Sequence, residues 1–301
     1  MLPNLMYPTM VCVAFWNVQH AAKSLHAVKT DNISDYLQKI AIDHAPHVFI
    51  ICESQNFAQR ALSHSCPNGY TMHGLPSRPT DSELGFTLLY NRLSIEDISA
   101  EYRSPVSPPD YKKSREDYLK YPHGEHTESD QHAPPLRKKP IRPTSLRPPL
   151  RVNIKLHGGK SYIISALHCY SHPGNISVQL EQIKECISGL DNFLGQSRAP
   201  PHIIIGDMNI DARENKNLGV ISRMMTSSNR RLKHAIPEMA THRGGTLDWA
   251  IVDISLDPEI NAYVPRGDAN KQKDEDDYQP TGDTNPSDHK AIILKIGVPA
   301  K

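Results

Sequence analysis

The chain has 301 residues, which is enough for one large domain or two small ones. It is 38% hydrophobic and 22% charged, as is usual for a globular protein with a sizeable core. The formal net charge of +1 excludes a global basic field that would attract nucleic acid, so any basic footprint must be local.

The cysteines and the first residues bear on where the protein works. The five cysteines are odd in number and form no CxxC pair, which favours reduced, buried thiols over a disulfide framework or a zinc site. Residues 1–9 lack the positive and apolar regions of a secretory signal peptide, and no apolar run approaches the roughly 18 residues of a membrane span. The sequence thus predicts a soluble protein, cytoplasmic or exported by a route that needs no such signal.

Short runs rich in Val and Ile predict a series of β-strands, because they are too short for buried helices and end in polar residues. The predicted strands are Met10–Trp16, His47–Cys52, Gly85–Tyr90, Leu150–Leu156, Ser161–Leu167, His202–Ile205, Thr246–Val252 and Ala291–Ile296.

Helical patterns lie between the strands. Asp31 or Asn32 is placed to cap a helix with apolar residues in register, and the stretches 178–194 and 220–225 predict two further helices. Strands and helices mixed in this way, with two strands adjacent across residues 157–160, indicate an α/β protein with a mixed sheet.

One segment, residues 103–149, lacks this pattern of strands and helices. It contains ten of the 25 prolines and ten Lys or Arg against six Asp or Glu, with almost no apolar periodicity. Such a composition cannot bury enough surface to offset its ordering entropy, so we expect a flexible insertion. Two readings stay open: a solvated loop without function, or a basic arm that contacts a polyanion beside the active site.

Polar side chains stand where the predicted strands end or begin. Glu53 follows a long apolar run, where burying a carboxylate costs several kcal/mol unless a partner such as Mg²⁺ is present. Asp207 and Asn209 are two residues apart, so on an extended segment both face the same way. The other residues of this kind are Asn17, His168, Asp248, Asp288 and His289.

Each of these residues also has a structural reading when it is taken alone. Asn17 suits a turn, Glu53 a surface turn, and His168 a satisfied structural histidine. Together they supply what hydrolysis of a phosphate ester needs: carboxylates for a divalent cation, a base to activate water, and donors to the phosphate oxygens.

In this order, the eight residues resemble the endonuclease/exonuclease/phosphatase superfamily, the fold of deoxyribonuclease I. Arg147, in Leu146-Arg147-Pro148-Pro149-Leu150, is similar to the arginine of that family. The resemblance covers roughly residues 10–297 except the insertion. It implies a single domain over residues 1–301, built as a four-layer α/β sandwich of two packed mixed β-sheets flanked by helices.

A closer resemblance is to the catalytic subunit of cytolethal distending toxins, carried by the strings at residues 14–19 and 241–251. This resemblance implies partner subunits; without it, we expect a monomer. The chain departs from the family pattern at Cys52, where Gln is usual, and at Met208, where Phe is common. The loss of the Gln amide puts the orientation of Glu53 in doubt.

The resemblance also implies a role for each residue. Glu53, with Asp288 and Asn17 beside it, would hold Mg²⁺ or Mn²⁺. His289 would be the base that activates water, and Asp248 would fix its tautomer.

The remaining residues would act on the phosphate. His168 would donate to it or protonate the leaving group, and Asp207 would help position water or metal. Asn17, Asn209 and Arg147 would donate hydrogen bonds to the phosphoryl oxygens. Glu83 lies close to where the family has a carboxylate that orients His168.

The sequence therefore predicts a Mg²⁺-dependent phosphodiesterase that hydrolyses DNA, such as a nicking or non-specific endonuclease. The alternative keeps the fold and metal but acts on a phosphomonoester or lipid headgroup, such as a phosphoinositide or sphingomyelin. A binding module without catalysis is disfavoured, because every expected catalytic residue is present.

Overall fold

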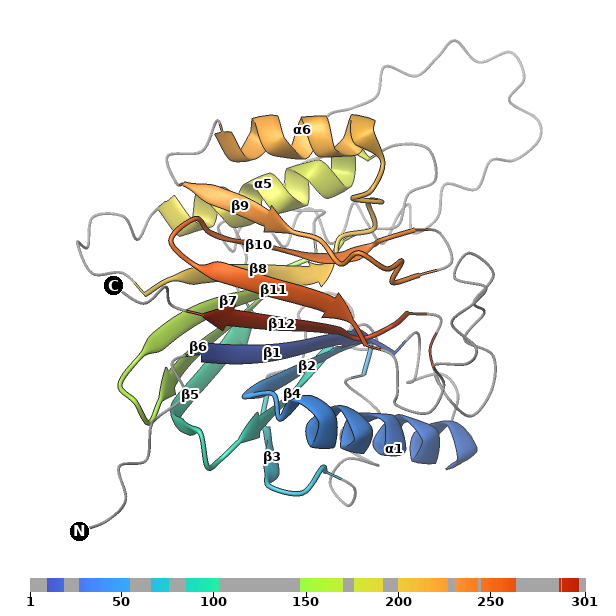
Figure 1. Cartoon of the computed structure of the whole chain (residues 1–301), viewed down its shortest axis with the longest axis vertical. Helices are drawn as coiled ribbons and strands as arrows, with labels where there is room; N and C mark the ends of the chain where they lie inside the picture. Colours follow the sequence, from blue (N-terminus) through green and yellow to red (C-terminus); the bar gives the residue numbers. More distant parts are fainter. Residues whose placement is uncertain are drawn as a thin grey trace, which may run out of the picture.

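The computed structural model of the chain describes residues 10–18, 27–54, 66–75, 85–102, 147–169, 176–191, 200–226, 231–242, 245–263, 287 and 289–297. These residues form two six-stranded β-sheets that pack face to face, with helices on the outer faces (Figure 1). The predicted four-layer α/β sandwich of two mixed sheets is confirmed.

The first sheet holds both ends of the described chain. Its strands are β1 (Met10–Asn17), β2 (Val48–Cys52), β3 (Tyr70–His73), β4 (Phe86–Asn91), β11 (Asp257–Ala262) and β12 (Ile292–Gly297). The spatial order is β11-β12-β1-β2-β4-β3. Only β1 and β2 pair in parallel, and the other neighbours are antiparallel.

The second sheet repeats this plan. Its strands are β5 (Ile95–Tyr102), β6 (Leu150–Leu156), β7 (Ser161–His168), β8 (His202–Asp207), β9 (Leu232–Ala235) and β10 (Asp248–Asp253). The order is β5-β6-β7-β8-β10-β9, with the parallel pair β7 and β8 at the centre. In both sheets a parallel pair is therefore flanked by antiparallel strands.

Alternation along the strands builds three apolar layers. In β1, Val11, Val13 and Phe15 point into the core between the sheets, whereas Ala14 and Trp16 point to the outer face. Helix α1 (Ala27–His44) covers the outer face of the first sheet, and helices α5 (Ser177–Asp191) and α6 (Asn215–Thr226) cover that of the second. Burying an Ile or Phe side chain in these layers contributes roughly 1.5–3 kcal/mol each.

The helix boundaries differ from those predicted. Helix α1 begins at Ala27, so the prediction that Asp31 or Asn32 caps it is wrong. Ile33 and Leu37 are fully buried against the sheet, and this packing stabilises a helix long enough to include two residues with weak helix propensity. Helix α6 extends beyond the predicted stretch at both ends, and α5 is described only to Asp191.

Four strands in the described part of the chain were not predicted from the sequence: β3, β5, β9 and β11. All four lie at the edges of the sheets. Their burial is partial, as in β5, where exposed and half-buried residues alternate after Ile95. An edge strand buries little of its surface, so it needs no continuous apolar run and leaves only a weak trace in the sequence.

Some predictions fall on residues outside the described ranges. Glu83, Asp288 and nearly all of the proposed insertion, residues 103–146, lie there. The strands on either side of that segment are neighbours, with Tyr102 of β5 opposite Leu150 of β6. Within the described ranges, no helix is long and apolar enough to cross a membrane. All five cysteines are free thiols, four of them buried, as the sequence predicted.

Candidate active site

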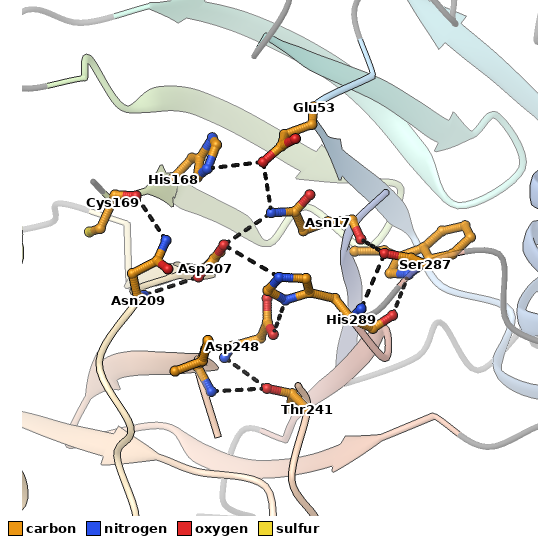
Figure 2. Close-up of polar contacts among 12 residues, drawn as sticks. Asn17, Glu53, His168, Cys169, Asp207, Asn209, Thr241, Asp248, Ser287 and His289 are labelled. Atoms are coloured by element: carbon orange, nitrogen blue, oxygen red, sulfur yellow. Dashed lines mark hydrogen bonds and ion pairs between the residues drawn. The ribbon is translucent and has the colours of Figure 1, made fainter. Parts of the chain in front are cut away.

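The four central strands of the two sheets end at one edge of the sandwich, and each carries a polar residue there. Asn17 ends β1 and Glu53 directly follows β2 in the first sheet, while His168 ends β7 and Asp207 ends β8 in the second. Two antiparallel neighbours start at the same edge, so that Asp248 opens β10 and His289 precedes β12. Figure 2 shows these six side chains gathered around one point.

Hydrogen bonds join the two sheets across this point. The Asn17 amide Nδ2 donates to Asp207 Oδ2 at 3.0 Å and to Glu53 Oε1 at 3.3 Å. His168 Nε2 lies 3.3 Å from the same Glu53 oxygen. All four side chains are buried. The structure thus brings together residues from both sheets that the sequence analysis selected one by one.

His289 and Asp248 form a second buried pair. His289 Nδ1 lies 2.8 Å from Asp248 Oδ2, and the carboxylate can only accept, so Nδ1 carries the proton. In a neutral ring the other nitrogen, Nε2, then bears a lone pair. Nε2 lies 3.9 Å from Asp207 Oδ2 and faces the same point as the other side chains. This is the geometry of a base that takes a proton from water.

Strand β8 needs a glycine at position 206, directly before Asp207. A Cβ at Gly206 would lie 2.1 Å from the carbonyl oxygen of Leu167 on the neighbouring strand β7, which no real contact permits. The close approach brings the parallel strands together so that His168 and Asp207 stand side by side in register. The string Ile-Gly-Asp is therefore dictated by packing as well as by chemistry.

Two of the selected residues have an unusual backbone. Glu53 and Asn209 have φ angles of 56° and 49°, in the left-handed region that costs most side chains free energy. The sequence analysis placed Asp207 and Asn209 on one extended segment, and this is wrong, because β8 ends at Asp207. Asn209 instead turns back: its backbone N–H donates to Asp207 Oδ1 at 3.0 Å and its Nδ2 donates to the Cys169 carbonyl at 2.9 Å.

Arg147 reaches the site from the residues just before β6. Its Nη1 lies 2.7 Å from His168 Nε2 and 3.2 Å from the Cys169 carbonyl oxygen. A guanidinium only donates, so the short contact requires a lone pair on His168 Nε2, which then cannot also donate to Glu53. The sequence analysis had grouped Arg147 with the phosphate ligands, and the structure places it beside His168.

Burial dominates the electrostatics of Asp207. It raises the pKa of the Asp207 carboxyl from 3.8 to about 6. His289, the Asn17 amide and the Asn209 N–H oppose this shift, whereas the neighbouring Asp248 carboxylate adds to it. Asp207 therefore changes its protonation state near neutrality rather than in acid.

The donor set around Glu53 suits a hard divalent cation. Glu53 offers a buried carboxylate and Asn17 an amide oxygen, and Mg²⁺ is commonly held by one or two carboxylates together with water and phosphate oxygens. A second group, Asp207, Asp248 and His289, has ligand atoms within 4.8 Å of one another. There the 2.8 Å hydrogen bond already engages His289 with Asp248, so this group is better suited to proton transfer.

Two buried hydroxyls support the site without having been predicted. Ser287 Oγ donates to the Asn17 carbonyl at 2.6 Å and accepts from the His289 N–H at 3.2 Å. Thr241 Oγ1 accepts from the N–H groups of Leu247 and Asp248, both at 3.0 Å. Thr241 lies in the string at residues 241–251 and Ser287 directly precedes Asp288, but a loop hydroxyl gives no sequence signal of what it holds.

Comparisons with known proteins agree on the fold. Models of known protein families and the curated proteins give no match to the chain. Solved structures do match, at low identity. One is an endonuclease/exonuclease/phosphatase family protein from Bacteroides thetaiotaomicron, with a TM-score of 0.57 and 14% identity over 98% of this chain and 100% of that one.

Two further structures carry more specific titles. D. rerio TDP2 complexed with single-strand DNA product has a TM-score of 0.61 and 10% identity, covering 96% of this chain and 100% of that one. A mannosyl-6-phosphatase from Bacteroides thetaiotaomicron has a TM-score of 0.56 and 13% identity, covering 95% and 99%. These three structures do not show the resemblance to cytolethal distending toxins. The chain has the fold of the endonuclease/exonuclease/phosphatase proteins.

Proposed function

We propose that the chain is a metal-dependent phosphodiesterase that hydrolyses DNA. The observation that supports it most is the meeting of Glu53, Asn17, Asp207 and the His289–Asp248 pair at one edge of the sandwich. A base, an amide donor and a cation-binding carboxylate in one buried place are parts that phosphate-ester hydrolysis requires.

His289 acts as the general base. Asp248 holds its Nδ1 proton and stabilises the imidazolium that forms when Nε2 takes a proton from water. Asp207 Oδ2, 3.9 Å from Nε2, is placed to accept a hydrogen bond from that water and so to orient it. The pair therefore generates the nucleophile next to the phosphorus atom.

Donors on the other side meet the phosphate. Asn17, Asn209 and Arg147 supply N–H groups to the oxygens on which charge develops, and His168 donates to the phosphate or to the leaving oxygen. For this, His168 gives up its contact with Arg147 and takes up a proton from solvent on Nε2, because a nitrogen that accepts from Arg147 has a lone pair and cannot donate. Glu53, with Asn17 and Asp288, would hold the Mg²⁺ or Mn²⁺ ion, which would neutralise phosphate charge.

Three observations favour DNA over the alternative substrates. The proline-rich segment 103–149 is locally basic, the strings at residues 14–19 and 241–251 resemble those of a DNA-cleaving toxin subunit, and one structural neighbour was solved with a DNA product. A phosphatase among the neighbours supports the alternative, in which the same site acts on a phosphomonoester or a lipid headgroup such as a phosphoinositide or sphingomyelin.

The test is the conversion of supercoiled plasmid to open circles by the purified protein with Mg²⁺. Loss of the base in His289→Ala should slow nicking by about 10²–10⁴-fold, and a chelator should stop it. The matched control is His157→Ala, since His157 is exposed in the turn at the opposite end of β7. Absence of nicking, together with phosphate release from inositol phospholipids, would replace DNA by the alternative substrate.

A further inference from the structure

Thr241 and His242 contact both members of the His289–Asp248 pair. Thr241 Oγ1 accepts the N–H of Asp248, and the Thr241 carbonyl accepts the N–H of Lys290 at 2.7 Å. The next residue, His242, forms an isolated β-bridge with His289. One short segment therefore touches the carboxylate residue, the base and the residue after the base.

The His242 ring lies over the ring of His289. The two ring centroids are 4.5 Å apart and the planes are inclined by 40°. At this separation the rings are in direct contact, which for aromatic pairs is favourable. One face of the base is thus covered by His242, which is itself only partly buried.

Backbone hydrogen bonds and close packing hold His242 in contact with His289. His242 and Gly245 exchange two backbone hydrogen bonds of 3.0 Å. Gly245 has a φ of 120°, and a Cβ there would lie 2.5 Å from the Asp211 carboxylate. Asp211 Oδ1 in turn accepts the N–H groups of Arg213 and Thr246 at 3.0 and 3.1 Å. The segment that presents His242 is thereby tied to the loop after β8.

The contact with His242 differs in kind from the other described contacts of His289. The backbone of His289 is anchored by Ser287 at its N–H and by Trp16 Nε1 at its carbonyl, 3.2 and 3.0 Å away. The ring edge contacts Asp248 through the Nδ1 hydrogen bond, and Nε2 lies 3.9 Å from Asp207 Oδ2. Both contacts lie at ring nitrogens, whereas the His242 ring contacts the ring of His289 itself and therefore resists its tilting.

We propose that His242 is a positioning residue for the base. Its ring blocks the tilt of His289, so that Nδ1 stays on Asp248 while Nε2 stays aimed at Asp207 and the attacked phosphate. This proposal rests on the proposed function. It assigns His242 no contact with substrate, and it attributes the effect to the flat face of the ring rather than to its charge.

The kinetic test compares three variants on a small diester, bis(p-nitrophenyl) phosphate, with Mg²⁺. His242→Ala should lower kcat by about threefold to tenfold and leave KM unchanged, as expected for losing one aromatic contact that matters only in the reacting geometry. His242→Phe restores a flat face without a titratable group and should recover kcat. The His157→Ala control should match the wild type.

A nuclear magnetic resonance measurement separates this proposal from the proposed function. The Nδ1 proton shared by His289 and Asp248 should give a sharp low-field signal in the wild type and in His242→Phe, and a broadened or lost signal in His242→Ala. This signal needs no substrate, so it tests the positioning role even if the wild type hydrolyses no diester. Inactivity of the wild type would instead count against the proposed function.

Three results would overturn the proposal: an unchanged kcat and proton signal in His242→Ala, a His242→Phe variant as impaired as His242→Ala, or a raised KM with kcat intact. The last result would mean that His242 contacts substrate. Should His242→Ala not fold, as judged by circular dichroism, His242→Leu takes its place. Leu fills the volume without a flat face, and it should lower kcat as Ala would.

Discussion

Asp207, at the end of β8, is buried, and burial makes its charged form unfavourable. Burial raises its pKa from 3.8 to about 6, so in the folded protein the carboxyl keeps its proton up to a higher pH than in the unfolded chain. Between these two values the native state binds more protons than the unfolded state, and the free energy of unfolding falls as the pH rises. Below about pH 4 the penalty is absent, and above about pH 6 it is fully present.

Replacing Asp207 by Asn removes this titration, so we expect a pH-dependent difference between the two proteins. From pH 4 to 7, metal-free wild type should lose on the order of 3 kcal/mol of stability relative to Asp207→Asn, with no further change above that range. Urea unfolding at several pH values measures it. A difference that stays constant with pH would mean that Asp207 titrates normally.

The residues of the candidate site were the easiest to select from the sequence. Glu53 and Asp207 each end an apolar run, and a carboxylate there contradicts the pattern enough to be noticed. Thr241 and His242 could not be found this way. A threonine and a histidine in a polar loop are not unusual, and what sets these two apart is contact with residues up to 49 positions away, between Thr241 and Lys290.

At the level of the elements, burial decided what could be predicted. The strands with both faces covered, such as β1 and β8, appear in the sequence as continuous apolar runs. The edge strands β3, β5, β9 and β11 do not, because solvent on one side leaves room for charged residues. The same reasoning explains why α1 was recognised by its buried face while its first turn was not.

The segment between β5 and β6 gives a prediction at this scale. Tyr102 and Leu150 are paired neighbours, so a short connection suffices to join the two strands. Deleting residues 106–144 should therefore leave circular dichroism and the melting temperature close to the wild type. If the segment grips DNA, the deletion should also flatten the salt dependence of DNA binding.

The effect of this deletion on folding and its effect on DNA binding test separate statements. An insoluble or molten product would show that the segment belongs to the fold, against the composition of residues 103–149. A folded product with an unchanged salt slope would make the segment a bystander to binding and leave the solvated-loop reading.

Across the whole molecule, the site links the two sheets, and a cation held there should stabilise the entire fold. Ligands that bind only the native state add about 2.7 kcal/mol at a concentration one hundred times their Kd. We expect saturating Mn²⁺ to raise the melting temperature of the wild type and to have little effect on Glu53→Gln. The control is Glu259→Gln on the exposed edge strand β11, which should respond as the wild type does. An equal Mn²⁺ response in all three proteins would place the ion elsewhere.

The position of β12 bears on when the candidate site forms during folding. This strand lies between β11 and β1, with Ile292 paired to Phe15 across the length of the chain, and His289 stands directly before it. Without β12, strand β11 is separated from the four strands β1, β2, β4 and β3, and His289 is not yet beside Asp248. We therefore expect the candidate site to assemble late in folding, because it needs this pairing between distant parts of the chain.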